Sequence, residues 1–182
     1  MDVGGRRKGF HAAAVDEEAL LAGPVRLTDV RGAVAWLRQV EPRLVAIDSP
    51  RSPAPSGRLS RTEERELARR VCGIRYTPNQ ARLESNSFFE WIEHGLELYA
   101  ALERAGLLAI ECFPTASFTR WAEPRGEETR ASWTRRAVAG LGLDGVPRRM
   151  NQDGRDAIAA ALTARAHHLG QTDSFGAIVV PR

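Results

Sequence analysis

The chain has 182 residues, of which 43% are hydrophobic and 27% are charged, and its formal net charge is +3. This length and composition suit one compact domain with a core, and they argue against global disorder. No apolar run is long enough to cross a bilayer, so we expect no membrane partner.

Arginine dominates the basic residues. Lys8 is the single lysine among the 26 Lys and Arg residues, so 25 of them are arginines. Arginine suits bidentate contacts with phosphate, but a surplus of three charges is small, so the composition is compatible with a nucleic-acid partner without being evidence for one. The two cysteines, Cys72 and Cys112, form no metal-binding motif, and the N-terminus lacks the apolar core of a signal peptide. We therefore expect reduced thiols in a cytoplasmic protein.

In chain order, the N-terminal part predicts two strands and a helix. Small and apolar residues over 9–16 and 23–30 are typical of strands, and a loop that contains Gly-Pro separates them. Apolar residues recur at helical spacing over 28–40, where Thr28 or Asp29 is a suitable cap.

The remainder of the chain predicts further helices and strands. A loop rich in Pro, Ser and Gly at 51–60, an irregular stretch at 73–87 and a polar segment at 115–130 interrupt them. Periodic apolar residues predict helices at 88–106 and 152–166. A charged, short helix is predicted at 61–72 and a further helix at 130–142. Apolar strands are predicted at 44–48, 107–111 and 176–181, the first two as strands buried on both faces of a parallel sheet. The order of elements predicts a single α/β domain over 1–182, with an initial hairpin sheet and later parallel strands.

Acidic residues end two of the predicted strands. Asp48 follows LVAI and Glu111 follows LLAI, each with a proline nearby. Ligands gather at the carboxyl ends of strands in open α/β sheets, so neighbouring strands would place both carboxylates at the mouth of the sheet. For either residue alone, an acid that merely starts a loop is the alternative.

Two further acids open the last predicted helix. Asp153 and Asp156 are three residues apart, close to one helical turn, so both carboxylates should point the same way. Capping of the helix N-terminus explains this pair when it is taken alone. Together with Asp48 and Glu111 the pair indicates a carboxylate cluster, which is unfavourable unless a hard cation such as Mg²⁺ or Mn²⁺ lies within it.

Seven segments run through nearly the whole chain: DVGGRRKGFHAAAVD, VAIDSP, GIRYTP, WIEHGLELYAAL, IECFPTASF, DGRDAIAAALTARA and GAIVVP. Their order and approximate spacing resemble the DUF429 family, proteins of unassigned function predicted to be nucleases with an RNase H-like fold. The resemblance implies an α/β fold, an RNase H-like mixed sheet flanked by helices. The family's first strand has apolar residues before its Asp, where this sequence has only Met1.

The resemblance also implies a set of metal ligands. Asp2 corresponds to the acid of the first strand, Asp48 and Glu111 to the acids of the inner strands, and Asp153 and Asp156 to the helix acids. In the implied mechanism, two Mg²⁺ or Mn²⁺ ions activate a water and stabilise the leaving oxygen of a phosphodiester. Asp48, Glu111 and Asp156 would be the catalytic ligands, and Asp2 and Asp153 would support them.

Four basic residues in the predicted loops are candidates for clamping phosphates: Lys8, Arg51, Arg58 and Arg61. Solvated surface side chains are the alternative for each of them. The competing functional class is a non-catalytic RNase H-like scaffold that binds nucleic acid or a protein. The related actin-like ATPase fold needs a second lobe, for which the chain is too short. A homodimer suits phosphodiester-cutting sheets of this type, although no residue indicates one.

Overall fold

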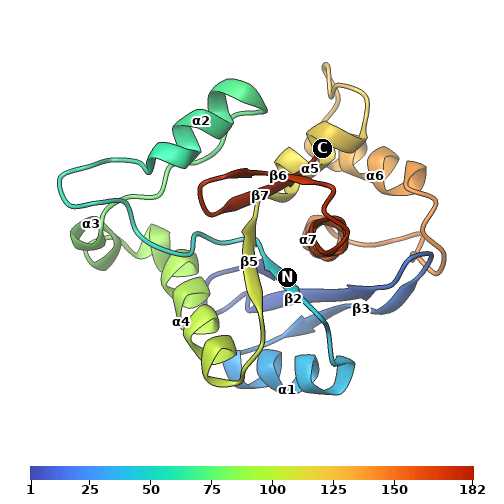
Figure 1. Ribbon diagram of the computed structural model, residues 1–182, viewed down its shortest axis with the longest axis horizontal. Coiled ribbons are helices and arrows are strands. Elements are labelled where there is room, and N and C mark those ends of the chain that lie inside the picture. The colour runs from blue at the N-terminus through green and yellow to red at the C-terminus, as the bar shows by residue number, and fades with distance from the viewer.

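The fold contains two β-sheets, and the N-terminal residues join them. Figure 1 shows the computed structural model, which describes residues 1–182. Strands β1 (Asp2–Val3), β2 (Phe10–Val15) and β3 (Leu20–Leu27) pair antiparallel in that order. A parallel bridge between Asp2 and Asp48 joins β1 to a second sheet. Its strands are, in spatial order, β4 (Val45–Ile47), β5 (Ala109–Cys112), β7 (Ile178–Pro181) and β6 (Thr172–Phe175), of which only β6 is antiparallel to its neighbour.

Seven α-helices and one 3₁₀ turn surround these strands. They are α1 (Val30–Val40), α2 (Thr62–Arg70), α3 (Gln80–Glu84), the turn η1 (Ser87–Phe89), α4 (Glu90–Arg104), α5 (Pro114–Trp121), α6 (Arg130–Gly140) and α7 (Gln152–His168). Helices α1 and α4 cover one face of strands β1 to β4, and α7, seen end-on in Figure 1, lies across the other face. Helices α5 and α6 pack against α7. None of the helices combines the length and the apolar character needed to span a membrane.

Alternation along the short strands gives the sheet two different faces. Val3, Phe10 and Ile47 are buried in the largest core cluster together with the apolar residues of α1 and α4. Successive side chains of a strand point to opposite faces, so the neighbouring Asp2 and His11 point toward α7. The face that meets α7 therefore carries polar side chains at its centre.

The predicted architecture is confirmed in its main elements. The structure is a mixed α/β sheet flanked by helices, and the strands predicted at 44–48 and 107–111 are parallel neighbours. The helices predicted at 61–72, 88–106, 130–142 and 152–166 are α2, α4, α6 and α7. Asp29 caps α1, because its side chain accepts a hydrogen bond from the backbone N–H of Gly32.

Two segments predicted as polar or irregular contain helices. The segment 115–130 overlaps α5, which starts with Pro114 at a position where proline is favoured and is too short to show a clear apolar period. The stretch 73–87 contains α3, a single turn of helix capped by Asn79. Short helices of this kind depend on their caps and on packing more than on a sequence period.

The strand predictions differ from the structure in two places. Strand β3 begins at Leu20 and includes the Gly-Pro pair that was predicted to be a loop. Because β3 is an edge strand, the missing N–H of Pro24 leaves no partner unpaired. Strand β6 was not predicted, since its sequence TDSF has no apolar run, and it too lies at an edge.

Gly95 of α4 permits close contact with the residues that follow β4. A Cβ atom at position 95 would lie 2.6 Å from the Cβ of Ser49. We expect Gly95→Ala to lower the free energy of unfolding by about 1–3 kcal/mol, the usual cost of overpacking a core. Urea unfolding followed by circular dichroism measures this loss. Gly140→Ala is the matched control, because a Cβ there meets nothing within 4 Å, and similar losses in both variants would contradict the close contact.

Candidate metal centre

Three polar side chains lie side by side on the face of the sheet that meets α7. Asp2 of β1 is directly opposite His11 of β2 in the antiparallel ladder. On its other side Asp2 forms the parallel bridge to Asp48, the first residue after β4. Cross-strand neighbours project to the same face of a sheet. The backbone pairing therefore gathers two carboxylates and an imidazole from three separate segments.

The first turns of α7 add two more carboxylates to this face. The helix is capped by Asn151, whose side chain accepts a hydrogen bond from the backbone N–H of Gly154. Capping therefore does not require Asp153 or Asp156, which was the alternative explanation for the pair. Asp156 is buried, and Asp153 is partly buried at the start of the helix. We call Asp2, Asp48, Asp153 and Asp156 the acid cluster.

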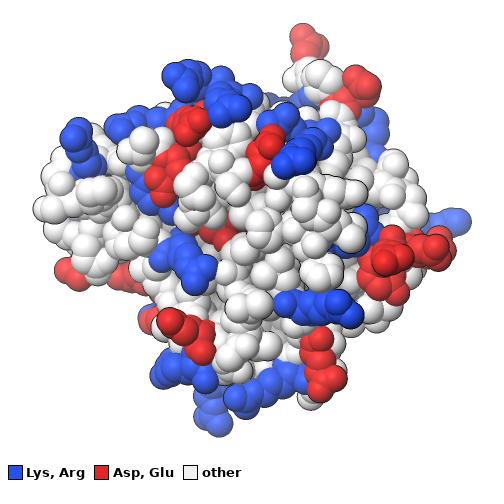
Figure 2. Space-filling model, in the orientation of Figure 1, with Lys and Arg blue, Asp and Glu red and all other residues white.

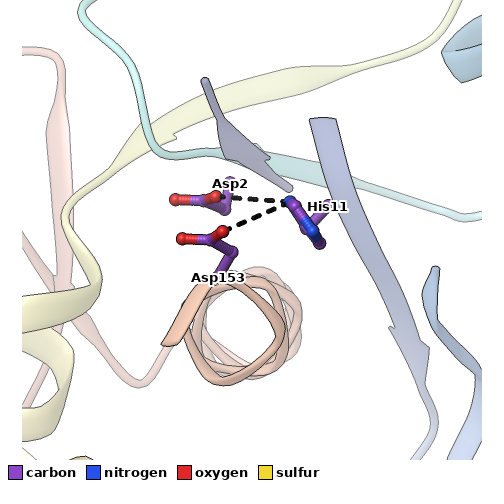
Figure 3. Close-up of side chains that lie close together, drawn as sticks. All are labelled: Asp2, His11 and Asp153. Atoms are coloured by element: carbon purple, nitrogen blue, oxygen red, sulfur yellow. Dashed lines mark ion pairs between the residues drawn. The ribbon is translucent and has the colours of Figure 1, made fainter. Parts of the chain in front are cut away.

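Asp2, His11 and Asp153 bring their ligand atoms close together in this region (Figure 3). The Nδ1 atom of His11 is 3.8 Å from Oδ2 of Asp2 and 3.9 Å from Oδ2 of Asp153. These separations are too long for hydrogen bonds. Two ligands held about 2.1 Å from one cation are at most about 4.2 Å apart. The two distances from His11 therefore fit a shared divalent cation, and the ligand atoms of all three side chains lie within 4.8 Å of one another.

Two atoms of this group are buried without a hydrogen-bond partner. They are Oδ2 of Asp2 and Nδ1 of His11, and both residues are more than nine-tenths buried. Buried polar atoms are nearly always paired in folded proteins, so an unpaired one calls for an explanation such as an ion. Burial lowers the pKa of His11, which favours the neutral imidazole, the form that binds metals.

The acid cluster is only partly neutralised by basic side chains. Nζ of Lys8 lies 2.7 Å from Oδ1 of Asp153, and Nη2 of Arg130 lies 3.0 Å from Oδ2 of Asp156. Asp2 and Asp48 have no Lys or Arg partner within ion-pair distance. Among the four carboxylates, these two would therefore be stabilised most by a bound cation.

Crowding and burial raise the pKa values of these carboxyl groups. Burial, reinforced by the charge of Asp156, raises the pKa of Asp2 to about 7. Burial and the charge of Asp2 raise the pKa of Asp48 well above its ordinary value. Burial also raises the pKa of Asp156, although Arg130 opposes the shift. Without a cation, burial and mutual repulsion therefore favour the protonated forms of Asp2, Asp48 and Asp156.

Glu111 does not join the acid cluster, which corrects the prediction that it lies beside Asp48. In the parallel ladder Glu111 is the partner of Ile47, not of Asp48. Its side chain therefore shares the face of Ile47, while Asp48 points to the other face. Its carboxylate accepts hydrogen bonds from the backbone N–H of Arg51 at 2.8 Å and from both terminal nitrogens of Arg61.

The four predicted phosphate-binding residues have different surroundings. Arg61 is buried, 2% exposed, and its guanidinium binds Glu111 and Glu64, so it is not available to a phosphate. Arg51 is exposed, with Nη1 donating to the carbonyl oxygen of Ala109. Arg58 is exposed, and Lys8 is bound to Asp153 at the acid cluster.

His11 is the site residue that the sequence analysis missed. The sequence predicts the strand at 9–16 and the family resemblance places Asp2 on the first strand, but neither gives the register between the two strands. The glycine-rich turn between them sets that register, and it places His11 directly across from Asp2. A hairpin register worked out from the turn would have found the residue.

The buried contact between Glu111 and Arg61 leads to a stability prediction. A buried charge that loses every partner costs about 3–5 kcal/mol. Arg61 keeps its pair with Glu64, so the loss here is that of the charge-assisted hydrogen bonds to Glu111, about 1.5–3 kcal/mol. We expect Glu111→Gln to lower the free energy of unfolding by this order, as measured by urea unfolding. Glu66→Gln is the control, because its pair with Arg70 is exposed and is worth less than about 1 kcal/mol. Equal losses in the two variants would show that the buried pair contributes no more to the free energy of unfolding than the exposed pair.

The raised pKa of Asp2 leads to a prediction about pH. Asp2 ionises near pH 3.8 in the unfolded chain and near pH 7 in the folded, metal-free protein, so between these values the folded state holds the extra proton. The free energy of unfolding in EDTA should therefore fall as the pH rises from about 4 to about 7, by up to about 1.4 kcal/mol per pH unit for this group. We expect Asp2→Asn to make the fall less steep in urea titrations between pH 5 and pH 8. Parallel curves for the two proteins would mean that Asp2 has an ordinary pKa.

Comparison with known proteins gives the chain a family but no function. No curated protein and no solved structure matches it. One family model, described as a protein of unknown function (DUF429), matches residues 1–179. Because the match covers nearly the whole chain, the protein belongs to the DUF429 family.

Proposed function

We propose that this DUF429 protein is a nuclease that hydrolyses phosphodiester bonds of nucleic acid with Mg²⁺ or Mn²⁺. The observation that supports this most strongly is the pair of buried, unpartnered ligand atoms, Oδ2 of Asp2 and Nδ1 of His11, which lie close to each other and to Asp153. A sheet that gathers carboxylates on one face, without enough basic side chains to balance them, is suited to a divalent cation.

The proposed ligands are Asp2, His11 and Asp153, with Asp48 and Asp156 next to them. A metal held by these residues would supply an activated water and would neutralise charge that develops on the phosphate. The imidazole of His11 favours a transition metal over Mg²⁺, which prefers oxygen ligands, so we expect Mn²⁺ to bind more tightly than Mg²⁺. Asp48 and Asp156 complete the negative environment that attracts the cation.

Two basic side chains next to the acid cluster are suited to contact the substrate. Lys8 and Arg130 are each about half exposed, at 49% and 44% of their side-chain surface. Each already lies against a carboxylate of the cluster, so a phosphate close to the metal ligands would meet a charge-assisted hydrogen-bond donor. In this proposal Lys8 and Arg130 position the phosphodiester, and the carboxylates hold the cation.

One contact favours a second candidate function. The ammonium group of Lys8 lies 2.7 Å from Asp153 and already supplies a positive charge beside Asp2. With Asp2 protonated, the cluster could persist without a metal ion. The protein would then be a non-catalytic scaffold that binds nucleic acid or a protein.

Metal binding is tested separately from catalysis. We expect millimolar Mn²⁺ to raise the melting temperature of the wild type, because a ligand that binds only the folded state stabilises it by mass action. The shift should disappear in Asp2→Asn, which keeps the size of the side chain but loses its charge. The control is Asp173→Asn, a partly exposed acid on β6 that pairs with Arg182. A shift of equal size in Asp2→Asn would mean that the cation binds elsewhere.

Cleavage is tested on labelled single-stranded, duplex and branched DNA and RNA. We expect cleavage that requires Mn²⁺ or Mg²⁺, is abolished by EDTA, and falls at least about 100-fold in Asp48→Asn or Asp156→Asn, since small displacements in such a site already cost two orders of magnitude. Asp173→Asn should cleave like the wild type. Cleavage that persists in EDTA would contradict the mechanism, and metal binding without cleavage of any substrate would favour the scaffold.

A further inference from the structure

A second polar site lies beside the acid cluster, between α6 and the segment that leads into α7. It is a hollow of about 650 Å³, within the usual size of ligand pockets. Four of its lining residues are arginines: Arg135, Arg148, Arg149 and Arg155. We call it the arginine hollow. Asp144 is the one acidic residue among its lining side chains.

The arginines of this hollow have no carboxylate partners. Arg135, Arg148 and Arg149 are exposed and form neither an ion pair nor a side-chain hydrogen bond. Arg155 is buried, 4% exposed, and donates to Oγ1 of Thr134, to the carbonyl oxygen of Met150 and to Oε1 of Gln152, all neutral acceptors. Within hydrogen-bond distance this buried arginine has only neutral acceptors, and the carboxylates that favour its charge, Asp156 and Asp153, lie farther away in the acid cluster.

The hollow differs from the rest of the surface because four arginines line one concave site, whereas single exposed arginines without a carboxylate partner, such as Arg31, also occur elsewhere. Figure 2 shows positive and negative side chains interspersed over one face of the molecule, with no region of a single sign covering it. Several arginines elsewhere do pair with acids, for example Arg6 with Glu97, Arg70 with Glu66 and Arg136 with Glu128. In the hollow, by contrast, none of the four arginines pairs with an acid. Like charges gathered without partners are the arrangement that an anion relieves.

One side chain connects the hollow to the acid cluster. The amide of Gln152 accepts a hydrogen bond from Arg155 through Oε1 at 3.0 Å and donates one to Oδ1 of Asp156 through Nε2 at 2.9 Å. Arg155 and Asp156 are also consecutive in α7. The two sites are therefore joined through one amide group.

We propose that the arginine hollow binds backbone phosphates of nucleic acid and holds the strand beside the metal centre. The choice of a nucleic acid as occupant rests on the proposed nuclease function, while the preference for phosphate rests on the arginines themselves. Arginine presents a planar fork that matches phosphate oxygens. Contacts of this kind fix the position of a strand and carry no base specificity.

The test is binding of fluorescein-labelled single-stranded and duplex oligonucleotides, measured by anisotropy in EDTA so that no cleavage occurs. We expect Arg148→Ala/Arg149→Ala to weaken binding about tenfold near 100 mM salt and to reduce the salt slope by about 1 to 2, since each phosphate contact contributes about 0.7 to 0.9. Both arginines are exposed and unpaired, so the variant should melt like the wild type. Arg148→Lys/Arg149→Lys keeps both charges and should retain most of the salt slope.

Arg31→Ala/Arg38→Ala on α1 is the matched control, because it removes two exposed arginines from a helix on the other face of the sheet. Unchanged binding by this control, with weaker binding by the hollow variant, supports the proposal. Equal binding by all variants, or no binding of any oligonucleotide by the wild type, overturns it. Binding of inorganic phosphate at the hollow without any binding of oligonucleotides also overturns it, and identifies a small-anion site.

The same samples separate this proposal from the nuclease. Oligonucleotide binding in EDTA that depends on Arg148 and Arg149, together with no cleavage in Mn²⁺, would support the arginine hollow as a binding site and reject the nuclease function. Cleavage in Mn²⁺, together with oligonucleotide binding that is unchanged in the Arg148→Ala/Arg149→Ala variant, would support the nuclease and reject the role of the arginine hollow.

Discussion

The structure depends on the pairing of a two-residue strand with two partners at once. Asp2 lies opposite His11 of the hairpin on one side and bridges to Asp48 on the other. The backbone N–H of Asp48 donates to the carbonyl oxygen of Met1, and the hairpin ladder continues through Val3. Without this strand the antiparallel and parallel parts of the sheet would have no hydrogen bonds in common. The same residues then determine which side chains reach the face below α7.

Helix α7 brings opposite charges to the two sides of its first turns. Asp153 and Asp156 approach the sheet, while Arg155 points into the arginine hollow next to α6. Residues three apart in a helix lie on the same side, whereas residues one or two apart do not. Asp153 and Asp156 therefore share one side of α7, and Arg155 lies on another. Asn151 provides the cap, which leaves all three side chains free for other contacts. The polar start of this otherwise alanine-rich helix is thus explained by its two different surroundings.

The sequence was a good guide to the elements and a poorer guide to side-chain direction. The apolar runs before Asp48 and Glu111 correctly predicted two adjacent parallel strands, because burial on both faces requires such runs. A run that is apolar throughout does not show which of its residues faces which side of the sheet. The sequence therefore does not predict to which face Asp48 or Glu111 points. Ile47 pairs with Glu111, and this offset of one residue sends the two acids to opposite faces. Arg61 was misjudged for a related reason, because its burial depends on Glu111, which lies 50 positions away in the chain.

The hydrogen bonds made by Glu111 have a consequence for how this domain tolerates changes in length. Its carboxylate binds the backbone of Arg51 and the side chain of Arg61, so a single strand residue fixes both ends of the largely exposed Pro-, Ser- and Gly-rich loop between them, whose Ala54 is buried and bridges to Asn79. Doubling the length of a loop with fixed ends costs only about 0.6 kcal/mol in closure entropy. Insertions or deletions in this loop are therefore confined to one side of the sheet, and they leave the acids under α7 in place. Related chains could acquire different loops here, and with them different surfaces, without any change in the sheet that holds the polar centre.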